Sequence, residues 1–302
     1  MSQCVGARAP RWSLQMTKIY MMGLLVALAG CDVGTFSAPI TESESESESE
    51  LELRDLFPDD AVLVGVTVAP DGRRYILDQR SGLYEISDSS ATLVLNTTGL
   101  TGLELTDVVA LDADRFALAA ENDGFLFDRR TGTFSSFFCY LPAPPAPPEG
   151  LPTEPPIEPI SISQALQLEG IPVKQRTESV AFNPDTRQLF AQPRTFRLDT
   201  GIVEGSELFV FGEGGGEPIQ VLPFADTSFV AGGMLAAPGD RLILGAGNGI
   251  YELTLGVGLE LLRELDASID ITGMARASNG DLWILDGPAR RLAKVEAPGV
   301  SP

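Results

Sequence analysis

The sequence predicts an all-β chain that folds as a five-bladed β-propeller, and two observations carry this prediction. First, a unit with a tight turn between short apolar runs occurs five times, and Thr272–Val295 (TGMARASNGDLWILDGPARRLAKV) is its clearest copy. The Asn279-Gly280 pair in this copy is a strong hairpin signal, because both central residues of such a turn need positive φ. Second, the copies recur with a period near 40 residues, which suits four short strands in each copy.

Each copy follows the same order of strand, turn and strand. The turn centres lie 42, 72, 54 and 40 residues apart, so the two longer intervals hold insertions on a common period. A fourth, outer strand is expected in each of the first four copies. The turn centres are Asp71, Ala113, Asp185, Gly239 and Asn279, and the expected outer strands are Thr92–Asn96, Thr133–Phe138, Ile219–Leu222 and Leu259–Glu264.

The last copy is followed by too few residues for an outer strand of its own. The segment Leu51–Leu56 (LELRDL), just ahead of the first copy, is similar to the outer strand Leu259–Glu264 (LELLRE). We therefore expect the N-terminal segment to complete the last blade. Such closure ties the two ends of the repeat array together and removes sheet edges that would otherwise pair with other chains.

Small or short side chains recur six residues before each turn centre, where the innermost strand of a blade begins. Neighbouring blades crowd together at this point, and glycine allows close backbone approach. The five positions are Gly65, Asp107, Ser179, Gly233 and Gly273.

The 72-residue interval contains a proline-rich insertion, residues 141–172, with the runs PAPPAPPEG and PTEPPIEPI. Proline at this density favours extended polyproline II backbone and does not enter a sheet interior. A stiff surface loop between blades is the preferred interpretation, and a docking strip for a partner is the alternative. A degenerate blade around Ile157–Val173, which would make the ring six-bladed, is also left open.

A repeat signature links the first and last copies. The pattern G-h-x-h-x-x-[DN]-G-x-h-h-h-h-D, where h is hydrophobic, occurs at Gly65–Asp78 and Gly273–Asp286. It resembles the blade signature of the NHL and SMP-30/gluconolactonase-like propellers, and the resemblance spans roughly Leu51–Val295. It implies the propeller fold but not one function, because such rings host unrelated activities.

The SMP-30 resemblance also implies a divalent cation such as Ca²⁺ at the channel mouth, held by oxygen ligands. The early Glu-Gly-Pro motif of that group is absent here, and Gly65 stands at the corresponding place in the first blade. No cofactor is therefore predicted, and hydrogen bonds to the backbone between blades are the preferred role for the acids near the inner strands. These weak metal candidates are Asp107, Glu178 and Asp270.

The N-terminal residues predict an export signal. Basic residues precede the apolar run Ile19–Ala29, which is too short to span a bilayer. The run ends in Leu28-Ala29-Gly30-Cys31, which resembles the lipobox of bacterial lipoproteins. The resemblance implies cleavage after Gly30 and attachment of acyl chains such as palmitate at Cys31. Met16 offers a second start that gives a more usual signal length.

Between the lipobox and the repeats, Thr41–Glu50 alternates Ser and Glu and has nothing apolar to bury. Such a segment is expected to be a solvated, disordered tether. The predicted organisation is a signal peptide at residues 1–30, a lipidated cysteine and tether at 31–50, a propeller at 51–297 and a tail at 298–302. The expected location is the bacterial cell envelope, on the outer membrane or the periplasmic face of the inner membrane.

Composition excludes several function classes. The formal net charge of −21 argues against nucleic acid as a partner, because phosphate recognition needs basic patches. The 302 residues include no histidine, which excludes Ser-His-Asp and Cys-His catalysis within this chain. With three cysteines, two of them in the export region, no disulfide framework is expected.

These features lead to one leading functional hypothesis and two alternatives. The leading one is a monomeric, membrane-anchored envelope lipoprotein whose propeller is a non-enzymatic binding or scaffold module for a protein, peptide or glycan. The first alternative is a metal-dependent, lactonase-like hydrolase of the SMP-30 type that uses Asp107, Glu178 and Asp270. The second is a purely structural envelope protein without a selective ligand.

Overall fold

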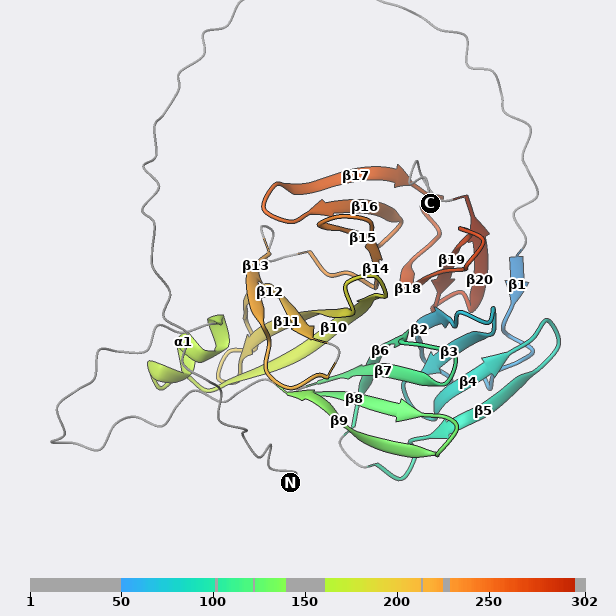
Figure 1. Ribbon diagram of the computed structural model, residues 1–302, viewed down its shortest axis with the longest axis horizontal. Helices are drawn as coiled ribbons and strands as arrows, with labels where there is room; N and C mark the ends of the chain where they lie inside the picture. The colour runs from blue at the N-terminus through green and yellow to red at the C-terminus, as the bar shows by residue number, and fades with distance from the viewer. Residues whose placement is uncertain are drawn as a thin grey trace, which may run out of the picture. The chain divides into compact units, whose positions relative to one another are not determined.

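The computed structural model describes residues 50–100, 103–121, 123–139, 161–212, 214–224 and 229–296. They form five four-stranded antiparallel sheets arranged in a ring, so the predicted five-bladed β-propeller is confirmed (Figure 1). Blade 1 holds β2 (Leu63–Val68), β3 (Arg74–Asp78), β4 (Gly82–Ile86) and β5 (Ala91–Asn96); blade 2 holds β6 (Leu105–Ala110), β7 (Arg115–Ala120), β8 (Asp123–Asp128) and β9 (Thr133–Cys139). Blade 3 holds β10 (Val173–Asn183), β11 (Gln188–Arg197), β12 (Val203–Gly212) and β13 (Gln220–Pro223). Blade 4 holds β14 (Gly233–Ala237), β15 (Arg241–Ala246), β16 (Gly249–Thr254) and β17 (Gly258–Glu264); blade 5 holds β18 (Ile271–Arg276), β19 (Leu282–Asp286), β20 (Arg291–Val295) and β1 (Glu50–Glu52).

The innermost strands close the ring. β2 contacts β6, β6 contacts β10, β10 contacts β14, β14 contacts β18, and β18 returns to β2. The predicted signal peptide, Leu28-Ala29-Gly30, Cys31 and the tether up to residue 49 lie outside the described residues. Cleavage and lipidation therefore stay predictions.

The N-terminal strand completes blade 5, as predicted. β1 pairs antiparallel with β20, and Glu50 lies opposite Ala293. The strand is shorter than the expected Leu51–Leu56, because the backbone turns at Leu53, whose carbonyl accepts hydrogen bonds from the N–H groups of Leu56 and Phe57. The Leu53 side chain is fully buried between blades 5 and 1, so the closure adds core as well as strand pairing.

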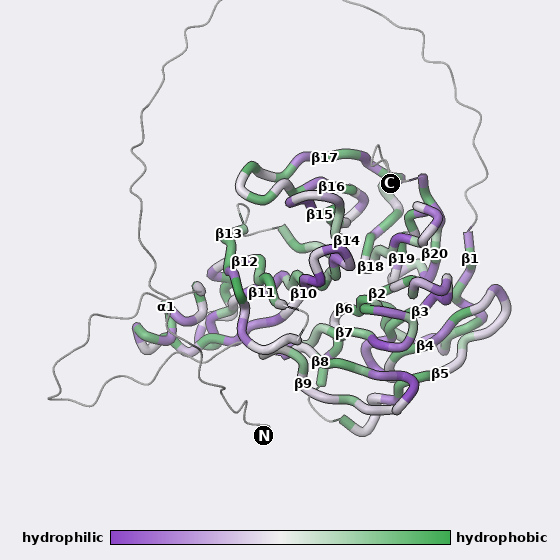
Figure 2. Tube along the Cα trace, viewed as in Figure 1, coloured by the Kyte–Doolittle hydropathy of each residue, from purple (hydrophilic) through white to green (hydrophobic). Residues whose placement is uncertain are grey.

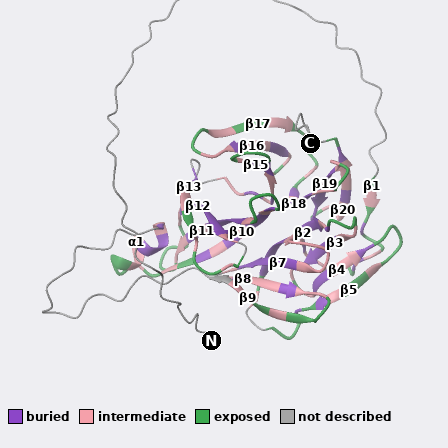
Figure 3. Ribbon diagram, in the orientation of Figure 1, coloured by how far each residue is buried: buried purple, intermediate pink, exposed green. Residues whose placement is uncertain are grey.

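The hydrophobic core is divided among the five interfaces between blades. Each cluster joins apolar residues from the facing sides of two neighbouring sheets. Successive side chains point to opposite faces of a sheet, and both faces of each blade pack against a neighbour, so a strand such as β7 (RFALAA) is apolar over most of its length (Figure 2). Inner strands are mostly buried, whereas outer strands such as β5 and β17 are largely exposed (Figure 3).

The small residues at the start of the inner strands meet around the axis. A Cβ atom on Gly273 would lie 2.7 Å from the backbone nitrogen of Val66, and one on Gly65 would lie 2.8 Å from Oδ1 of Asp107. Both distances are shorter than side-chain contacts allow. The predicted crowding at these positions is therefore present, and glycine is required where the neighbouring backbone fills the space.

Blade 3 departs from the repeat. Its first three strands have 10 or 11 residues, and β10 begins at Val173 rather than near Ser179, because a bulge between Thr177 and Ser179 lets the strand continue. The end of the proline-rich insertion forms a helix, α1 (Ile162–Leu168), where a sixth blade was the alternative. Residues 141–160 of the insertion lie outside the described residues. No helix in the described part of the chain has the length and hydrophobicity needed to cross a membrane.

Helix α1 docks on β12 through a buried carboxylate. Ser161 caps the helix, and Glu207 Oε1 accepts a hydrogen bond from the Ile162 N–H at 2.9 Å. A Cβ atom on Gly205 would lie 2.3 Å from the Ile162 side chain, so helix and strand are in close contact. Only 5% of Glu207 is exposed, and burial raises its pKa to about 7. Blade 3 thus carries a buried carboxylate beside the hydrophobic clusters that it shares with blades 2 and 4.

Candidate functional site

Asp107, the first predicted metal candidate, joins two blades. Its Oδ1 accepts a hydrogen bond from the Val108 N–H at 2.8 Å, and its Oδ2 accepts one from the Val180 N–H of blade 3 at 2.9 Å. The residue is 2% exposed, and burial raises the pKa of the carboxyl well above its usual value, against the effect of the two N–H donors. Both oxygens are therefore engaged with backbone, in the structural role that the sequence favoured.

The other two candidates lie in different surroundings. Glu178 lies between two cations, with its oxygens 3.5 Å from Arg176 and 3.4 Å from Arg194. Asp270 is exposed, just before β18. Within the described ranges, no three His, Cys, Asp or Glu side chains form a group that could hold a metal ion. The Ca²⁺ site stays an untested prediction of the family resemblance.

Asp78 and Asp286, which end the second strands of blades 1 and 5, bond to nearby backbone. Asp78 Oδ1 accepts a hydrogen bond from the Val62 N–H at 2.8 Å, and Asp286 Oδ1 accepts one from the Ala289 N–H at 3.1 Å. The last residue of the repeat signature therefore has a structural role in both blades.

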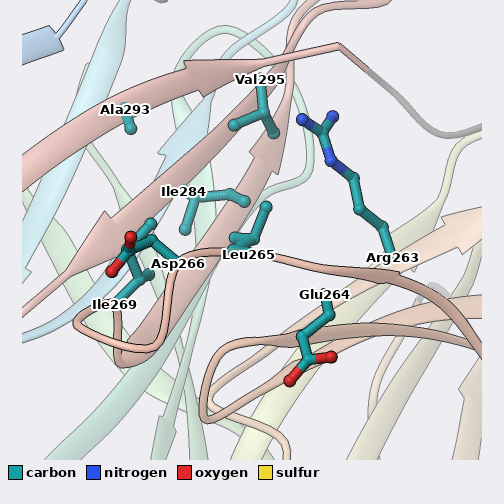
Figure 4. A pocket seen from close by; sticks show the side chains of 8 residues that line it. All are labelled: Arg263, Glu264, Leu265, Asp266, Ile269, Ile284, Ala293 and Val295. Atoms are coloured by element: carbon teal, nitrogen blue, oxygen red, sulfur yellow. The ribbon is translucent and has the colours of Figure 1, made fainter. Parts of the chain in front are cut away.

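A pocket that the sequence did not predict opens between blades 4 and 5. Its volume is about 260 Å³, and Figure 4 shows how strands of blade 5 and the segment after β17 surround it. The floor is aliphatic and the mouth is charged. The floor residues are Leu265, Ile269, Ile284, Ala293 and Val295, and the charged groups at the mouth belong to Arg263 and Asp266. Glu264 borders the pocket from β17, and its side chain points away from the floor (Figure 4). We call this site the interblade pocket.

The repeat explains why a pocket forms at this interface. In every blade, one residue of the first strand pairs with a residue of the second, which pairs with a residue of the third. We call these three residues the row, and the row faces the preceding blade. The third member is aromatic in four blades and alanine in blade 5. The rows are Val66–Ile76–Tyr84, Val108–Leu118–Phe125, Val180–Ala191–Phe209, Met234–Leu244–Tyr251 and Met274–Ile284–Ala293.

Each of the four aromatic residues packs beside a second ring. The ring centroids are 5.0 Å apart for Tyr84 and Phe57, and 4.9 Å apart for Phe125 and Phe134. They are 6.2 Å apart for Phe209 and Phe211, and 5.1 Å apart for Tyr251 and Phe229. Rings at these separations fill the outer part of an interface. In blade 5 the side chain at this position is a single methyl group, and the space beside it is open.

Local hydrogen bonds hold the two carboxylates that border the pocket. Asp266 Oδ1 accepts from the Ser268 N–H at 2.8 Å, and this bond holds the pKa of Asp266 below its usual value. Asp266 is therefore ionised at neutral pH. Asn248 Nδ2 donates to Glu264 Oε1 at 3.4 Å, on the face of β17 turned away from the pocket.

Backbone contacts hold the rest of the pocket wall. The Ile269 N–H donates to the Asp266 carbonyl at 3.0 Å, and the resulting turn places Ile269 on the floor. Arg263 Nη1 donates to the Glu296 carbonyl at 3.2 Å, across from β17 to the end of β20. The pocket thus has a fixed wall, an apolar floor and a mouth with the Asp266 carboxylate and the Arg263 guanidinium group.

Sequence reasoning missed this site although a signal was present. The third strands of blades 1, 4 and 5 read GLYEI, GIYEL and RLAKV. The tyrosine of the first two is replaced by Ala293 in the third. Only the pairing register shows that the three positions are equivalent and that all of them face an interface.

No family model and no curated protein matches the chain, so the NHL and SMP-30 resemblance stays a prediction. Among solved structures, the chain is similar to one in a crystal structure of the mitotic checkpoint complex, at 10% identity over 91% of this chain and 100% of that chain, with a TM-score of 0.42. It is also similar to a structural genomics protein of unknown function from Bacteroides thetaiotaomicron, at 10% identity over 82% of this chain and 76% of that chain, with a TM-score of 0.45. The fold assignment rests on the sheet topology.

Proposed function

We propose that this protein is a bacterial envelope lipoprotein whose propeller is a non-enzymatic binding module. The interblade pocket is the observation that carries the proposal. Concave sites with an apolar floor and a few placed polar groups are the usual form of ligand sites in proteins. At about 260 Å³ the pocket is smaller than the roughly 300–1,000 Å³ typical of drug-sized ligands, so it suits one side chain or one ring.

The lipobox and tether support display of this pocket at a membrane. The tether joins the propeller at β1, and Glu50 lies opposite Ala293, a residue of the pocket floor. Residues 32–50 span about 24 Å as a flexible coil, and their negative charges extend them further. An acyl chain at Cys31 would keep the pocket near the lipid surface, at a mean separation set by the length of this tether.

Lipidation is tested by metabolic labelling with an alkynyl palmitate analogue in a bacterial host. We expect the wild-type chain to incorporate the label and to sediment with membranes. The variant Cys31→Ala should lose both properties, whereas Cys139→Ala should keep them. Equal labelling of wild type and Cys31→Ala would refute the anchor.

Binding at the pocket is tested by photo-crosslinking in the same host. A photoreactive amino acid at Ile269, on the pocket floor, is compared with one at Val257, which is 84% exposed in the turn between β16 and β17. We expect one discrete crosslinked product from position 269 and none in common with position 257. The same products from both positions would refute the pocket as the binding site.

A further inference from the structure

We infer that Arg276 and Arg241 form a binding site for a small oxyanion where blades 4 and 5 meet. Arg276 is the last residue of β18 and pairs with Leu282 of β19, which in turn pairs with Val295 of β20. Leu282 and Val295 belong to the hydrophobic cluster between blades 4 and 5, so the Arg276 side chain faces blade 4. Neither arginine lines the interblade pocket, and the inference therefore does not depend on the proposed function.

The other four blades carry an apolar residue at the position of Arg276. This position lies two residues after the first member of the row, and in those blades it packs against the hydrophobic cluster of the same interface. The four residues are Val68, Ala110, Phe182 and Ala236. An apolar side chain is thus sufficient for packing at this position, and the repeat does not account for a guanidinium group in blade 5.

The guanidinium group of Arg276 lacks a counter-ion. The residue is half-buried, and its Nε is buried and donates no hydrogen bond. Within the described residues it makes no ion pair with a carboxylate, and burial and the nearby charge of Arg241 both lower the pKa of Arg276. Arginine stays charged in proteins, and buried charges are usually paired. The described part of the chain leaves this charge without compensation.

Arg241 contributes a second guanidinium group from the other blade. It pairs with Ala237, a member of the same hydrophobic cluster, so its side chain faces blade 5. Its Nη1 donates to Glu252 Oε2 at 3.1 Å, and its Nε donates to the Pro238 carbonyl at 3.0 Å. These bonds fix the orientation of the group. Glu252 offsets one of the two positive charges, so a net positive charge remains between the blades.

An oxyanion is the ligand that suits this arrangement. A guanidinium group presents its N–H donors in a planar fork that matches the oxygens of carboxylate and phosphate groups. The net charge of −21 repels anions from most of the surface, so binding would depend on local donors instead of long-range attraction. An anion held by one arginine from each blade would also link blades 4 and 5.

The test follows the Tm of the full chain in mild detergent while phosphate replaces chloride at constant ionic strength. We expect a saturable rise of about 2–4 °C in the wild type, because a ligand that binds only the folded chain stabilises it. Arg276→Met should lose the saturable rise and keep only the general stabilisation that phosphate gives by exclusion from protein surfaces. Arg130→Met removes an exposed arginine after β8 and should keep the full rise.

Two further measurements separate an anion site from a structural arginine. In chloride alone, Arg276→Met should be at least as stable as the wild type, because the equivalent positions of the other blades are apolar. In ¹H–¹⁵N spectra, the Nε–H signal of Arg276 should be visible at neutral pH, since a buried Nε exchanges slowly with water, and it should shift as phosphate is added.

Each outcome decides the inference. An equal rise in Tm for the wild type and Arg276→Met would overturn it, and so would an Arg276 Nε–H signal that phosphate does not move. A lower Tm of Arg276→Met in chloride alone would assign the arginine a structural role and would also overturn it. Acetate in place of phosphate identifies the preferred group: a larger Arg276-dependent rise with acetate indicates carboxylate, a larger one with phosphate indicates phosphate, and either result supports the site.

Discussion

The interface between blades 1 and 2 and the interface between blades 4 and 5 are built on the same backbone but are filled differently. At the first, Phe125 ends the row and lies 4.9 Å from Phe134, with the buried pair Tyr75 and Phe116 deeper in the interface. At the second, Ala293 ends the row and a pocket of about 260 Å³ opens beside it. Side chains of the two blades fill one interface, whereas the described residues of the other leave a pocket.

This comparison shows how a repeat protein acquires a site. The sheet register keeps the row in place in every blade, so the backbone does not need to change. Replacing one aromatic side chain removes most of the volume that fills the outer interface, and close-packed neighbours do not collapse fully into such a space. A site can therefore arise at one interface while the other four keep the ring together.

The strongest way to test the comparison is to empty a filled interface. Phe125→Ala should reproduce the blade 5 arrangement in blade 2 and lower the free energy of unfolding by about 2–3 kcal/mol, because the side chain is partly buried. The measurement is denaturant unfolding followed by circular dichroism. Val257→Ala, at a residue that is 84% exposed in the turn between β16 and β17, is the control. A loss below about 1 kcal/mol would show that the row does not hold the interface.

The buried carboxylate of Glu207 in blade 3 extends the comparison. It tests whether a departure from the repeat lowers the stability of the folded chain. Burial raises the pKa of Glu207 from its ordinary value of 4.5 to about 7. The folded chain thus binds the proton more tightly than the unfolded chain. The stability that the protonated carboxyl contributes is present below pH 4.5 and is lost as pH rises towards 7.

Glu207→Gln should remove this loss, because the amide is neutral and its oxygen still accepts from the Ile162 N–H. At pH 8 we expect the variant to be more stable than wild type by about 2–3 kcal/mol, with little difference at pH 4. Denaturant unfolding at both pH values measures this. Parallel pH profiles for the two proteins would contradict the assignment, and Glu204→Gln serves as a matched control on the same strand.

A substitution at the axis of the ring is expected to have an intermediate effect on stability. Gly273→Ala places a methyl group against the backbone of Val66 and should cost about 1–3 kcal/mol, because backbone atoms cannot move aside as side chains do. Gly99→Ala, where a Cβ atom meets nothing within 4 Å, should change stability by less than about 0.5 kcal/mol. Similar Tm values for the two variants would show that the ring centre is not crowded.

The smallest effect concerns the ion pairs beside the filled interface. Arg129 of blade 2 lies 2.5 Å from Glu85 of blade 1, and both side chains are about 30% exposed. A double-mutant cycle of Arg129→Gln and Glu85→Gln should give a coupling energy of about 0.5–1 kcal/mol that falls in 1 M salt. A coupling above about 2 kcal/mol would show that charge, more than packing, closes this interface.

Much of the fold could be predicted from the sequence, because strand patterns and turn residues act locally. The spacing of Asn279-Gly280 and its four equivalents indicated the number of blades, and the similarity of residues 51–56 to 259–264 indicated the closing strand. The long strands of blade 3 and helix α1 could not be predicted in this way. They depend on the bulge at Thr177 and on the buried contact between Glu207 and the helix, which join residues far apart in sequence.

By itself, the sequence determined a ring of five sheets, the small residues at its axis and the order in which the chain closes on itself. These features follow from the hydrophobic period, the turn residues and the length of chain between the turns, all of which are properties of the sequence alone. Only the tertiary structure decided that Asp107 bonds to the Val180 N–H of blade 3, that Glu178 pairs with arginines and that Ala293 borders a pocket. The reason is physical: a side chain's role depends on what the neighbouring blade places opposite it, and the interface brings those residues together only after the ring has closed.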